Sequence, residues 1–406
     1  MKKKLILASL VLGTGAGAAC AQSSVTLYGI LDAGIGYSNN QAVTVTPGAA
    51  GRPAMLVNHS KLGFVSGSTF ADRWGLKGVE DLGGGYRAVF TLENGFNIGT
   101  GAFASAGTMF NRQAFVGLGN TRYGTLTFGR QYDPLVDLVE PLGPTRFLNG
   151  IAAHPGDLDD FDNSLRISNS VKYTSPVMGG FTIEALYGFG GQPGSMHDKS
   201  TYGIGAAYAR GPLAGSVAYY RADNSKTGPD DVTNGTWVGS SDSIFNSSIN
   251  AGFASAETLQ IIGTAWNYVI GPVTLGLNYS NVQYRPGPFS LFHRNQKFNT
   301  GGAVASWQVT STLALATAYA YSRGSSVDSS SSPPQYNQIS VAAFKNLSKW
   351  TILFLVGGYQ HASGRTLDAF GNVVDATASV GDASNGGGSS ASNSQVVVRA
   401  GIRHHF

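Results

Sequence analysis

The amino-acid sequence predicts an all-β fold, a transmembrane up-and-down antiparallel β-barrel of 16 strands. Three observations predict it: apolar and polar residues alternate with a period of two, short turns alternate with long polar connections, and the chain begins with an export signal. The 56 glycines, 18 tyrosines and 21 phenylalanines also favour strands and turns over helices. After the export signal no apolar run approaches the roughly 20 residues of a membrane-spanning helix, so strands must make the crossing.

Residues 1–21 have the pattern of a cleaved secretory signal peptide. Lys2–Lys4 precede an apolar stretch, Leu5–Leu12, and Ala19-Cys20-Ala21 supplies small residues for cleavage. The mature chain, residues 22–406, is then one barrel domain without cysteine, because Cys20 is the only one. A lipidated Cys20 is the alternative, but Gly17 stands where such a site usually has leucine.

The charge balance excludes one class of partner. The chain has a net charge of +4, and three of its lysines lie in the predicted signal. A mature protein so close to neutral, with few charged residues, implies no nucleic-acid partner.

The two ends of the mature chain alternate most clearly. In residues 395–406 the apolar Val398 and Ile402 share one face, while Arg399 and Arg403 share the other. Val25 and the apolar residues that follow it at even spacing form a similar face in the first run. Both ends are therefore expected to be strands, and they can be neighbours in a closed sheet.

Connections of two lengths alternate along the chain. Since seven short turns join strand pairs and one strand remains at each end, the pattern predicts 16 strands, with the termini on the short-turn, periplasmic side. The short turns are residues 82–85, 120–123, 175–180, 210–212, 270–272, 310–312 and 346–349. The long connections are roughly residues 38–70, 99–108, 133–165, 190–199, 223–256, 285–296, 324–334 and 362–394.

Aromatic residues gather near the ends of the predicted strands, where amphipathic rings would lie at the level of the lipid headgroups. Packing inside a soluble β fold is the alternative interpretation. The residues concerned are Tyr219, Tyr220, Trp266, Tyr268, Tyr279, Trp307, Tyr319, Tyr321, Trp350 and Tyr359.

Several motifs together resemble one known family. They are Ser24–Gly29, Asp72–Gly85, Phe90–Phe96, Phe110–Leu118, Gly124–Asp133, Asn169–Tyr173 and the terminal Phe406. Over essentially the whole mature chain, this combination resembles the general trimeric porins of Gram-negative outer membranes. The resemblance implies a homotrimer in outer-membrane lipid that lets ions and small hydrophilic solutes diffuse through a water-filled pore.

The resemblance also gives residues 133–165 a role. In that family a long third loop folds into the barrel and narrows it, and this segment stands at the corresponding place. We expect the stretch Val136–Pro141 at the constriction, although the family's Pro-Glu-Phe-Gly-Gly tip is absent. A solvent-exposed acidic loop is the alternative. The acidic residues predicted for the constriction are Asp133, Asp137, Glu140, Asp157 and Asp159, with Asp160 and Asp162 in the same segment.

Basic residues are expected on the opposite wall. Strand alternation sends Arg73 and Lys77 to the lumen, and Arg112 opens the next matching strand. Arg166 corresponds to a further wall arginine of the family. Opposed charges across a narrow aqueous gap would create a transverse field that separates cations from anions. The acidic loop favours cations, and ordinary surface ion pairing is the alternative.

Two further residues are expected to act outside the pore. Arg130 alternates with Leu126 and Phe128 and so points outward, where an arginine facing lipid would cost roughly 2–4 kcal/mol. A subunit contact would relieve this, which makes Arg130 a candidate trimer contact. Phe406 resembles the terminal aromatic residue that the barrel-assembly machinery recognises in this family.

No enzymatic chemistry, cofactor or metal is expected. The seven histidines lack metal-site spacing, and no Gly-x-Ser-x-Gly elbow occurs between a strand and a helix. Three alternatives to a general channel remain: a sugar- or anion-selective channel of the same fold, a plugged structural or adhesin barrel, and a secreted soluble β protein.

Overall fold

The computed structural model describes residues 24–224, 240–242, 245–327, 330–381 and 388–406. The predicted signal peptide, residues 1–21, lies outside the described residues. Within those ranges, no helix is long and apolar enough to span a membrane.

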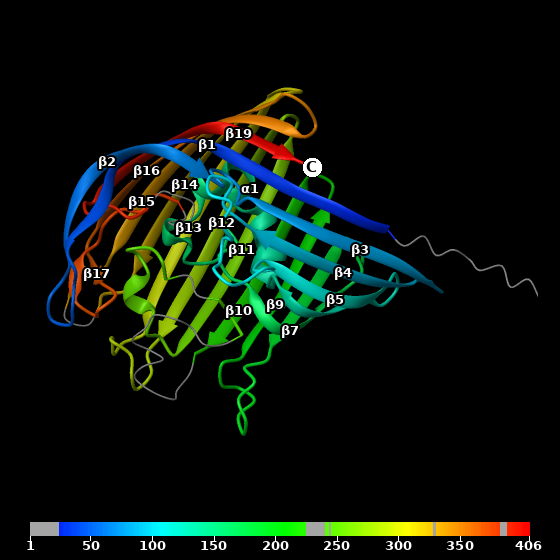
Figure 1. The fold of residues 1–406 in the computed structure, drawn as a ribbon, viewed down its shortest axis with the longest axis horizontal. Helices are drawn as coiled ribbons and strands as arrows, with labels where there is room; N and C mark the ends of the chain where they lie inside the picture. Colours follow the sequence, from blue (N-terminus) through cyan, green and yellow to red (C-terminus); the bar gives the residue numbers. More distant parts are fainter. Residues whose placement is uncertain (1–23, 225–239, 243–244, 328–329, 382–387) are drawn as a thin grey trace, which may run out of the picture.

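The described strands form one closed antiparallel barrel (Figure 1). β2 and β3 pair with successive parts of β1 and together make one barrel strand, so the barrel has the predicted 16, and β1 closes it against β19. The strands are β1 (Ser24–Thr46), β2 (Met55–Ser66), β3 (Arg73–Gly83), β4 (Tyr86–Gly95), β5 (Gln113–Asn120), β6 (Gly124–Gln131), β7 (Ile167–Thr174), β8 (Phe181–Gly188), β9 (Thr201–Arg210), β10 (Leu213–Asp223), β11 (Thr258–Ile270), β12 (Val273–Arg285), β13 (Gln296–Thr310), β14 (Leu313–Gly324), β15 (Gln335–Asn346), β16 (Thr351–Ser363) and β19 (Ser394–His405), and a separate pair is formed by β17 (Arg365–Leu367) and β18 (Val373–Asp375).

All seven predicted short turns are present at one rim of the barrel. Gly211 and Gly271 show why these turns use glycine, because both have positive φ angles, 59° and 56°, which side chains with a Cβ disfavour. The long connections emerge at the other rim.

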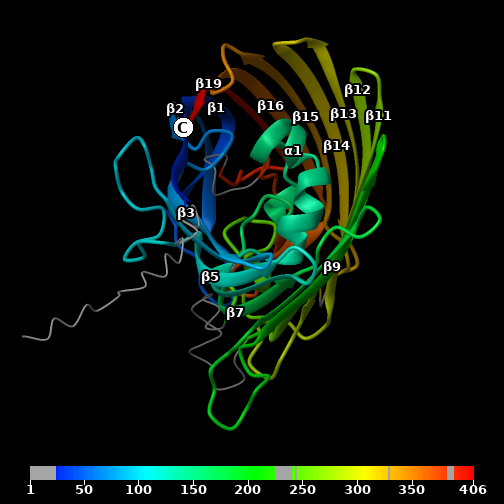
Figure 2. The ribbon, with the colours of Figure 1, turned by 90° about the vertical axis from the view of Figure 1, so that its right-hand side faces the viewer.

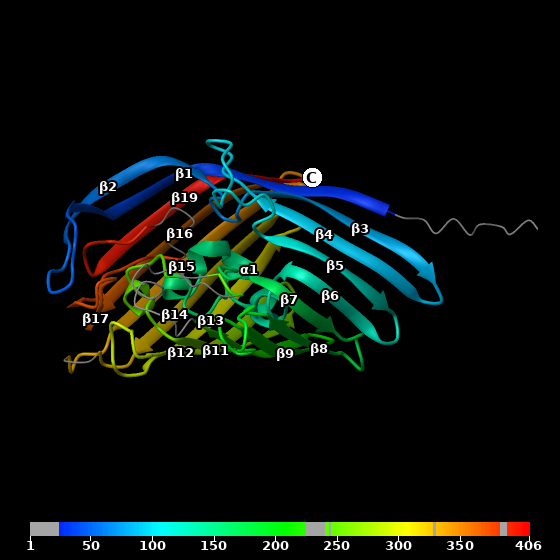
Figure 3. The same ribbon diagram turned by 60° about the horizontal axis from the view of Figure 1, so that its bottom comes forward.

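The predicted first long connection, residues 38–70, is wrong over most of its length. β1 continues to Thr46 and β2 starts at Met55, so a hairpin extends past the rim (Figure 3). The partner strand of β1 is interrupted between β2 and β3. There the buried carboxylate of Asp32 accepts hydrogen bonds from the backbone N–H groups of Thr69 and Phe70, both at 3.2 Å, and replaces the missing ladder bonds.

Alternation along the strands separates an apolar outer face from a polar inner face, as predicted. On β19, Val398 and Ile402 are exposed on the outside, whereas Arg399 and Arg403 are buried inside the barrel. Most of the predicted interfacial aromatics are exposed, among them Trp266, Trp307, Tyr319, Trp350 and Tyr359.

The connection between β6 and β7 folds into the barrel (Figure 2). Leu148 and Ile151 are buried there against Phe354 and Val356 of β16. Glycines of the opposing wall leave room for this loop, since a Cβ at Gly263 would come within 2.6 Å of the Phe161 ring. Its helical segments are η1 (Leu135–Val139), η2 (Glu140–Leu142), α1 (Thr145–Leu148), η3 (Asn149–Ala152) and η4 (Pro155–Asp157).

Two other long connections also pack inside. In the β10–β11 connection, η5 (Ala251–Phe253) places Phe253 against Tyr284 and Phe298, with ring centroids 5.1 and 5.6 Å apart. In the β16–β19 connection, Val380 is fully buried in the cluster that also holds Ile151. The lumen beside β11–β16 is therefore filled by apolar loop residues, and cavities remain beside β3–β7.

Candidate constriction of the barrel lumen

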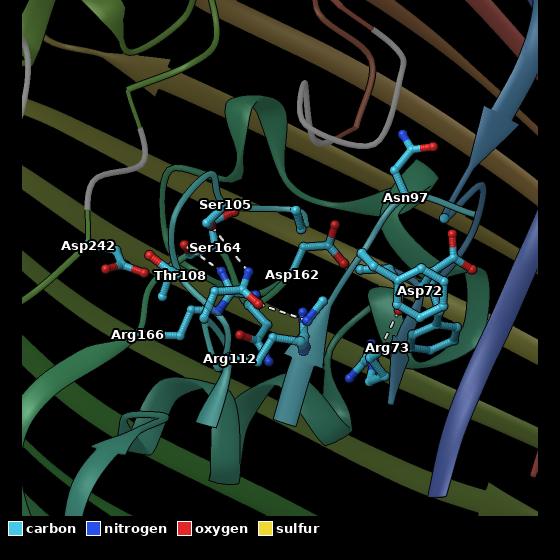
Figure 4. Close-up of a pocket in the computed structure, with 18 of the residues that line it drawn as sticks. Asp72, Arg73, Asn97, Ser105, Thr108, Arg112, Asp162, Ser164, Arg166 and Asp242 are labelled. Carbon is cyan, nitrogen blue, oxygen red and sulfur yellow. Dashed lines mark hydrogen bonds between the residues drawn. The ribbon is translucent and has the colours of Figure 1, made fainter. Parts of the chain in front are cut away.

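The inward loop and the wall enclose a charged cavity of about 890 Å³ (Figure 4). Four arginines from different segments line it: Arg73 at the start of β3, Arg112 before β5, Arg130 on β6 and Arg166 before β7. The acidic residues on its lining are Asp72, Glu140, Asp162 and Asp242. Charges of both signs thus face one aqueous space.

Arg112 is held on the wall by a hydrogen-bonded ion pair. Its Nε lies 2.7 Å from Glu93 Oε1 on β4, and each side chain is 5% exposed. The hydroxyls of Tyr132 and Tyr28 donate to the same carboxylate at 2.8 and 2.9 Å. Glu93 therefore offsets the charge of Arg112 and fixes its position. Glu93 was not among the predicted site residues, although it alternates into the lumen with the predicted cations.

A second cavity, of about 530 Å³, lies nearer the short-turn rim. Lys77 and Asp137 both line it, and Asp137 pairs with Lys172 of β7. The ammonium of Lys172 also lies 3.7 Å from Glu184 Oε1. The predicted Lys77 and Asp137 therefore line a different cavity from Glu140, and the sequence interpretation missed Lys172 and Glu184. Both come from strands whose alternation could have pointed them out.

Glu140 is the predicted carboxylate that faces the arginine-lined cavity most directly. It opens η2 in the inward loop, so it lies outside the membrane-spanning strands. Burial raises the pKa of Glu140 to about 7, against the opposing attraction of Arg73 and Arg112. Its negative charge is therefore only partly present at neutral pH.

Three of the predicted constriction carboxylates do not line either cavity, and the prediction for them is wrong. Asp133, Asp157 and Asp159 are each 1% exposed or less. Their oxygens satisfy the folded loop itself: Asp133 Oδ1 accepts from the backbone N–H of Leu135 at 2.7 Å, and Asp157 Oδ2 accepts from Ser164 Oγ at 2.5 Å. A loop folded into a lumen must satisfy its own backbone donors, and aspartates do so well.

Asp159 joins the loop to the barrel. Its Oδ2 lies 2.5 Å from Nδ1 of His154, which is also fully buried, and it accepts a hydrogen bond from Ser280 of β12. His154 Nε2 lies 2.8 Å from Asn278 Oδ1 on the same strand. Burial alone would lower the pKa of His154, but the carboxylate of Asp159 and these hydrogen bonds raise it. Four of the seven acidic residues of the loop, Asp133, Asp157, Asp159 and Asp160, are thus buried and bonded within the fold, which weakens the reason for expecting cation preference.

The prediction that Arg130 points outward is also wrong. The β6–β7 register shifts between Gly129 and Gln131, and Gly129 has a φ of 138°. The extra residue of this bulge lies in β7, between Ile167 and Ser170. Beside it the Arg130 guanidinium donates to Ser168 Oγ, lines the cavity and pairs with Asp242. The proposed trimer contact loses its physical basis.

Phe406 lies where the barrel closes. Its backbone N–H donates to Gly29 O at 3.1 Å, and Gly29 N–H donates to Phe406 O at 3.0 Å. The last residue is therefore bonded to the first strand.

This closed barrel, with an inward loop and charged cavities, has the architecture of an outer-membrane channel protein. A family model described as Gram-negative porin matches residues 7–365. The chain belongs to the Gram-negative porin family, and it is an outer-membrane β-barrel.

The names of curated relatives agree with this family assignment. An outer membrane porin protein of Bordetella pertussis is 35% identical over 283 residues, covering 70% of this chain and 60% of that protein. Outer membrane porin protein 32 of Delftia acidovorans is 34% identical over 229 residues, covering 53% and 59%. The matches thus span about 60% of the length of these relatives.

Solved structures share the fold. The anion-selective porin from Comamonas acidovorans superposes with a TM-score of 0.68 at 22% identity, covering 95% of this chain and 100% of that one. Outer-membrane expressed OmpT of Vibrio cholerae superposes with a TM-score of 0.59 at 14% identity, covering 95% and 98%.

Proposed function

We propose that this protein is a channel for passive diffusion of ions and small hydrophilic solutes, that residues 133–165 form its constriction, and that the constriction prefers anions. The observation that carries the proposal is the convergence of Arg73, Arg112, Arg130 and Arg166 on one cavity. Arginine stays charged at every physiological pH, so the positive charge on this lining is permanent.

The negative charge on the same lining is weaker. Two of its four carboxylates are weakened, because Asp242 is paired with Arg130 and Glu140 is only partly ionised at neutral pH; Asp72 and Asp162 remain. A lining with permanent positive and reduced negative charge attracts anions. The anion selectivity named for the Comamonas acidovorans porin agrees with this direction.

The proposal also covers the partners of the channel. A homotrimer in outer-membrane lipid, and recognition of Phe406 by the barrel-assembly machinery, would follow from family membership. We propose no reaction for the protein, since its relatives are named as porins.

Single-channel conductance in a planar bilayer, with reversal potential under a KCl gradient, tests the proposal. Wild type should give large steps in groups of three and a potential of the anion-preferring sign. Arg73→Gln/Arg166→Gln should move the potential towards cations, whereas Arg122→Gln, on an exposed short turn, should not. Absence of any conductance would instead support a plugged structural barrel.

A further inference from the structure

The connection from β10 to β11, residues 224–257, is here called loop 5. Its residues 240–242 lie along the start of β7, where Ile167 and Ser241 form an antiparallel bridge. Ser168 N–H donates to Ser240 O at 2.6 Å, and Asp242 N–H donates to Arg166 O at 3.0 Å. Residues 240–242 thus act as a short extra strand on β7.

The wall leaves room for this extra strand. β8 pairs with β7 only from Ser170 to Thr174, so Ile167 and Ser168 have no ladder partner from β8. An unpaired strand edge accepts an additional segment readily. Loop 5 supplies that segment and thereby comes to line the arginine cavity with Ser241 and Asp242.

Arg130 fastens the segment through its side chain. Its Nη1 donates to Asp242 Oδ1 at 3.1 Å and its Nη2 to Asp242 Oδ2 at 2.5 Å, which is a two-point, fork-like contact. Nη1 also donates to Ser168 Oγ at 2.7 Å, and Nε donates to Asn111 O at 2.7 Å. The guanidinium therefore ties together β6, β7, the end of the β4–β5 connection and loop 5.

We propose that Asp242 is a positioning and selectivity-determining residue of the channel: with Arg130 it latches residues 240–242 to the wall and cancels one positive charge in the cavity. The inference rests on the proposed channel function for its selectivity part only. In Figure 4, Asp242 lies beside Arg166 at the edge of the cavity.

The charge and the latch make separable predictions. Asp242→Asn leaves Arg130 without its counter-charge, so the cavity gains net positive charge. Arg130→Lys keeps the charge but loses the fork, because an ammonium cannot reproduce the planar two-point contact. The first variant therefore tests selectivity, and the second tests positioning.

The reversal potential under a salt gradient measures the effect of Asp242 on ion selectivity. We expect Asp242→Asn to raise the anion-to-cation permeability ratio roughly two-fold, the order of change that Coulomb's law gives for one uncompensated charge acting across a water-filled pore. Asp223→Asn is the matched control, because Asp223 pairs with Arg221 at 2.8 Å at the base of the same loop but does not line the cavity. Equal ratios for Asp242→Asn, Asp223→Asn and wild type would overturn this part.

Thiol labelling measures the latch without relying on conductance. Ser241→Cys places a thiol under the latch, since Ser241 is 4% exposed. Adding Arg130→Lys should speed its reaction with a water-soluble maleimide by about ten-fold, as expected when a charge-assisted hydrogen-bond pair is lost. The parent chain corrects for any labelling at Cys20.

Unchanged labelling in the Arg130→Lys background would overturn the latch. If wild type carries no current yet labelling responds to Arg130, the channel proposal fails while the latch stands. If current flows but neither readout responds, the latch and the role of Asp242 fail while the channel proposal stands.

Discussion

The ring of Phe406 occupies the space that a side chain at Gly29 would need. Their backbones exchange two hydrogen bonds, and a Cβ at position 29 would lie 2.3 Å from Phe406 Cζ and 2.7 Å from the carbonyl oxygen of Arg73. Glycine at this position therefore lets the last residue complete the barrel seam, so closure depends on a pair at opposite ends of the chain.

Gly29→Ala should weaken the closed barrel. Overpacking of a tight contact costs about 1–3 kcal/mol, so the temperature at which the folded band disappears on a semi-native gel should fall. Gly63→Ala on β2 is the control, because a Cβ there meets nothing within 4 Å. Equal melting temperatures for the two variants would show that the seam tolerates a side chain at position 29.

Glu93→Gln should both destabilise the wall and increase anion preference. The variant removes the counter-charge of a nearly buried Arg112, with a loss of roughly 2 kcal/mol in the free energy of unfolding. Urea unfolding of the barrel and reversal potential measure the two effects. Glu80→Gln makes the same charge change at an exposed position of β3 and should leave both values near those of wild type.

Anion preference should rise as the pH falls through about 7. Burial raises the pKa of Glu140 to about 7, so lowering the pH protonates this carboxyl and removes a negative charge from the arginine cavity. Reversal potentials between pH 5 and 9 measure the change, a window that spans about two pH units on each side of this pKa. Glu140→Gln should remove most of the dependence; an identical pH profile in this variant would assign the titration to another group.

His154→Gln should loosen the inward loop from β12. The folded-state pKa of His154 is raised, so its contribution to stability is present at low pH and is lost as the pH rises through that pKa. Wild type should therefore show a noisier open-channel current at alkaline pH, and His154→Gln should show a noisy current at every pH. His197→Gln, in an exposed loop, is the control. A quiet His154→Gln channel at neutral pH would argue against this anchor.

Strand alternation and turn chemistry alone determined the barrel. They predicted the seven short turns, the strand number and the placing of Arg399 and Arg403 on the face opposite Val398 and Ile402, because each depends on residues adjacent in sequence. Residues 133–165 were assigned to the inward loop by family resemblance. Its acidic residues could not be sorted from sequence, because Asp137 and Glu140 line cavities while Asp133, Asp157 and Asp159 satisfy local donors or the barrel wall.

Only the tertiary structure decided which charges face the lumen. Beside the bulge between β6 and β7, Arg130 faces the cavity instead of the outside, and Asp242 meets it from more than a hundred residues away. Alternation with a period of two describes only a regular strand, so it fails beside a bulge, and no local pattern reports which distant loop fills the resulting edge. The sequence thus determined the barrel, whereas long-range packing decided the electrostatics of its pore.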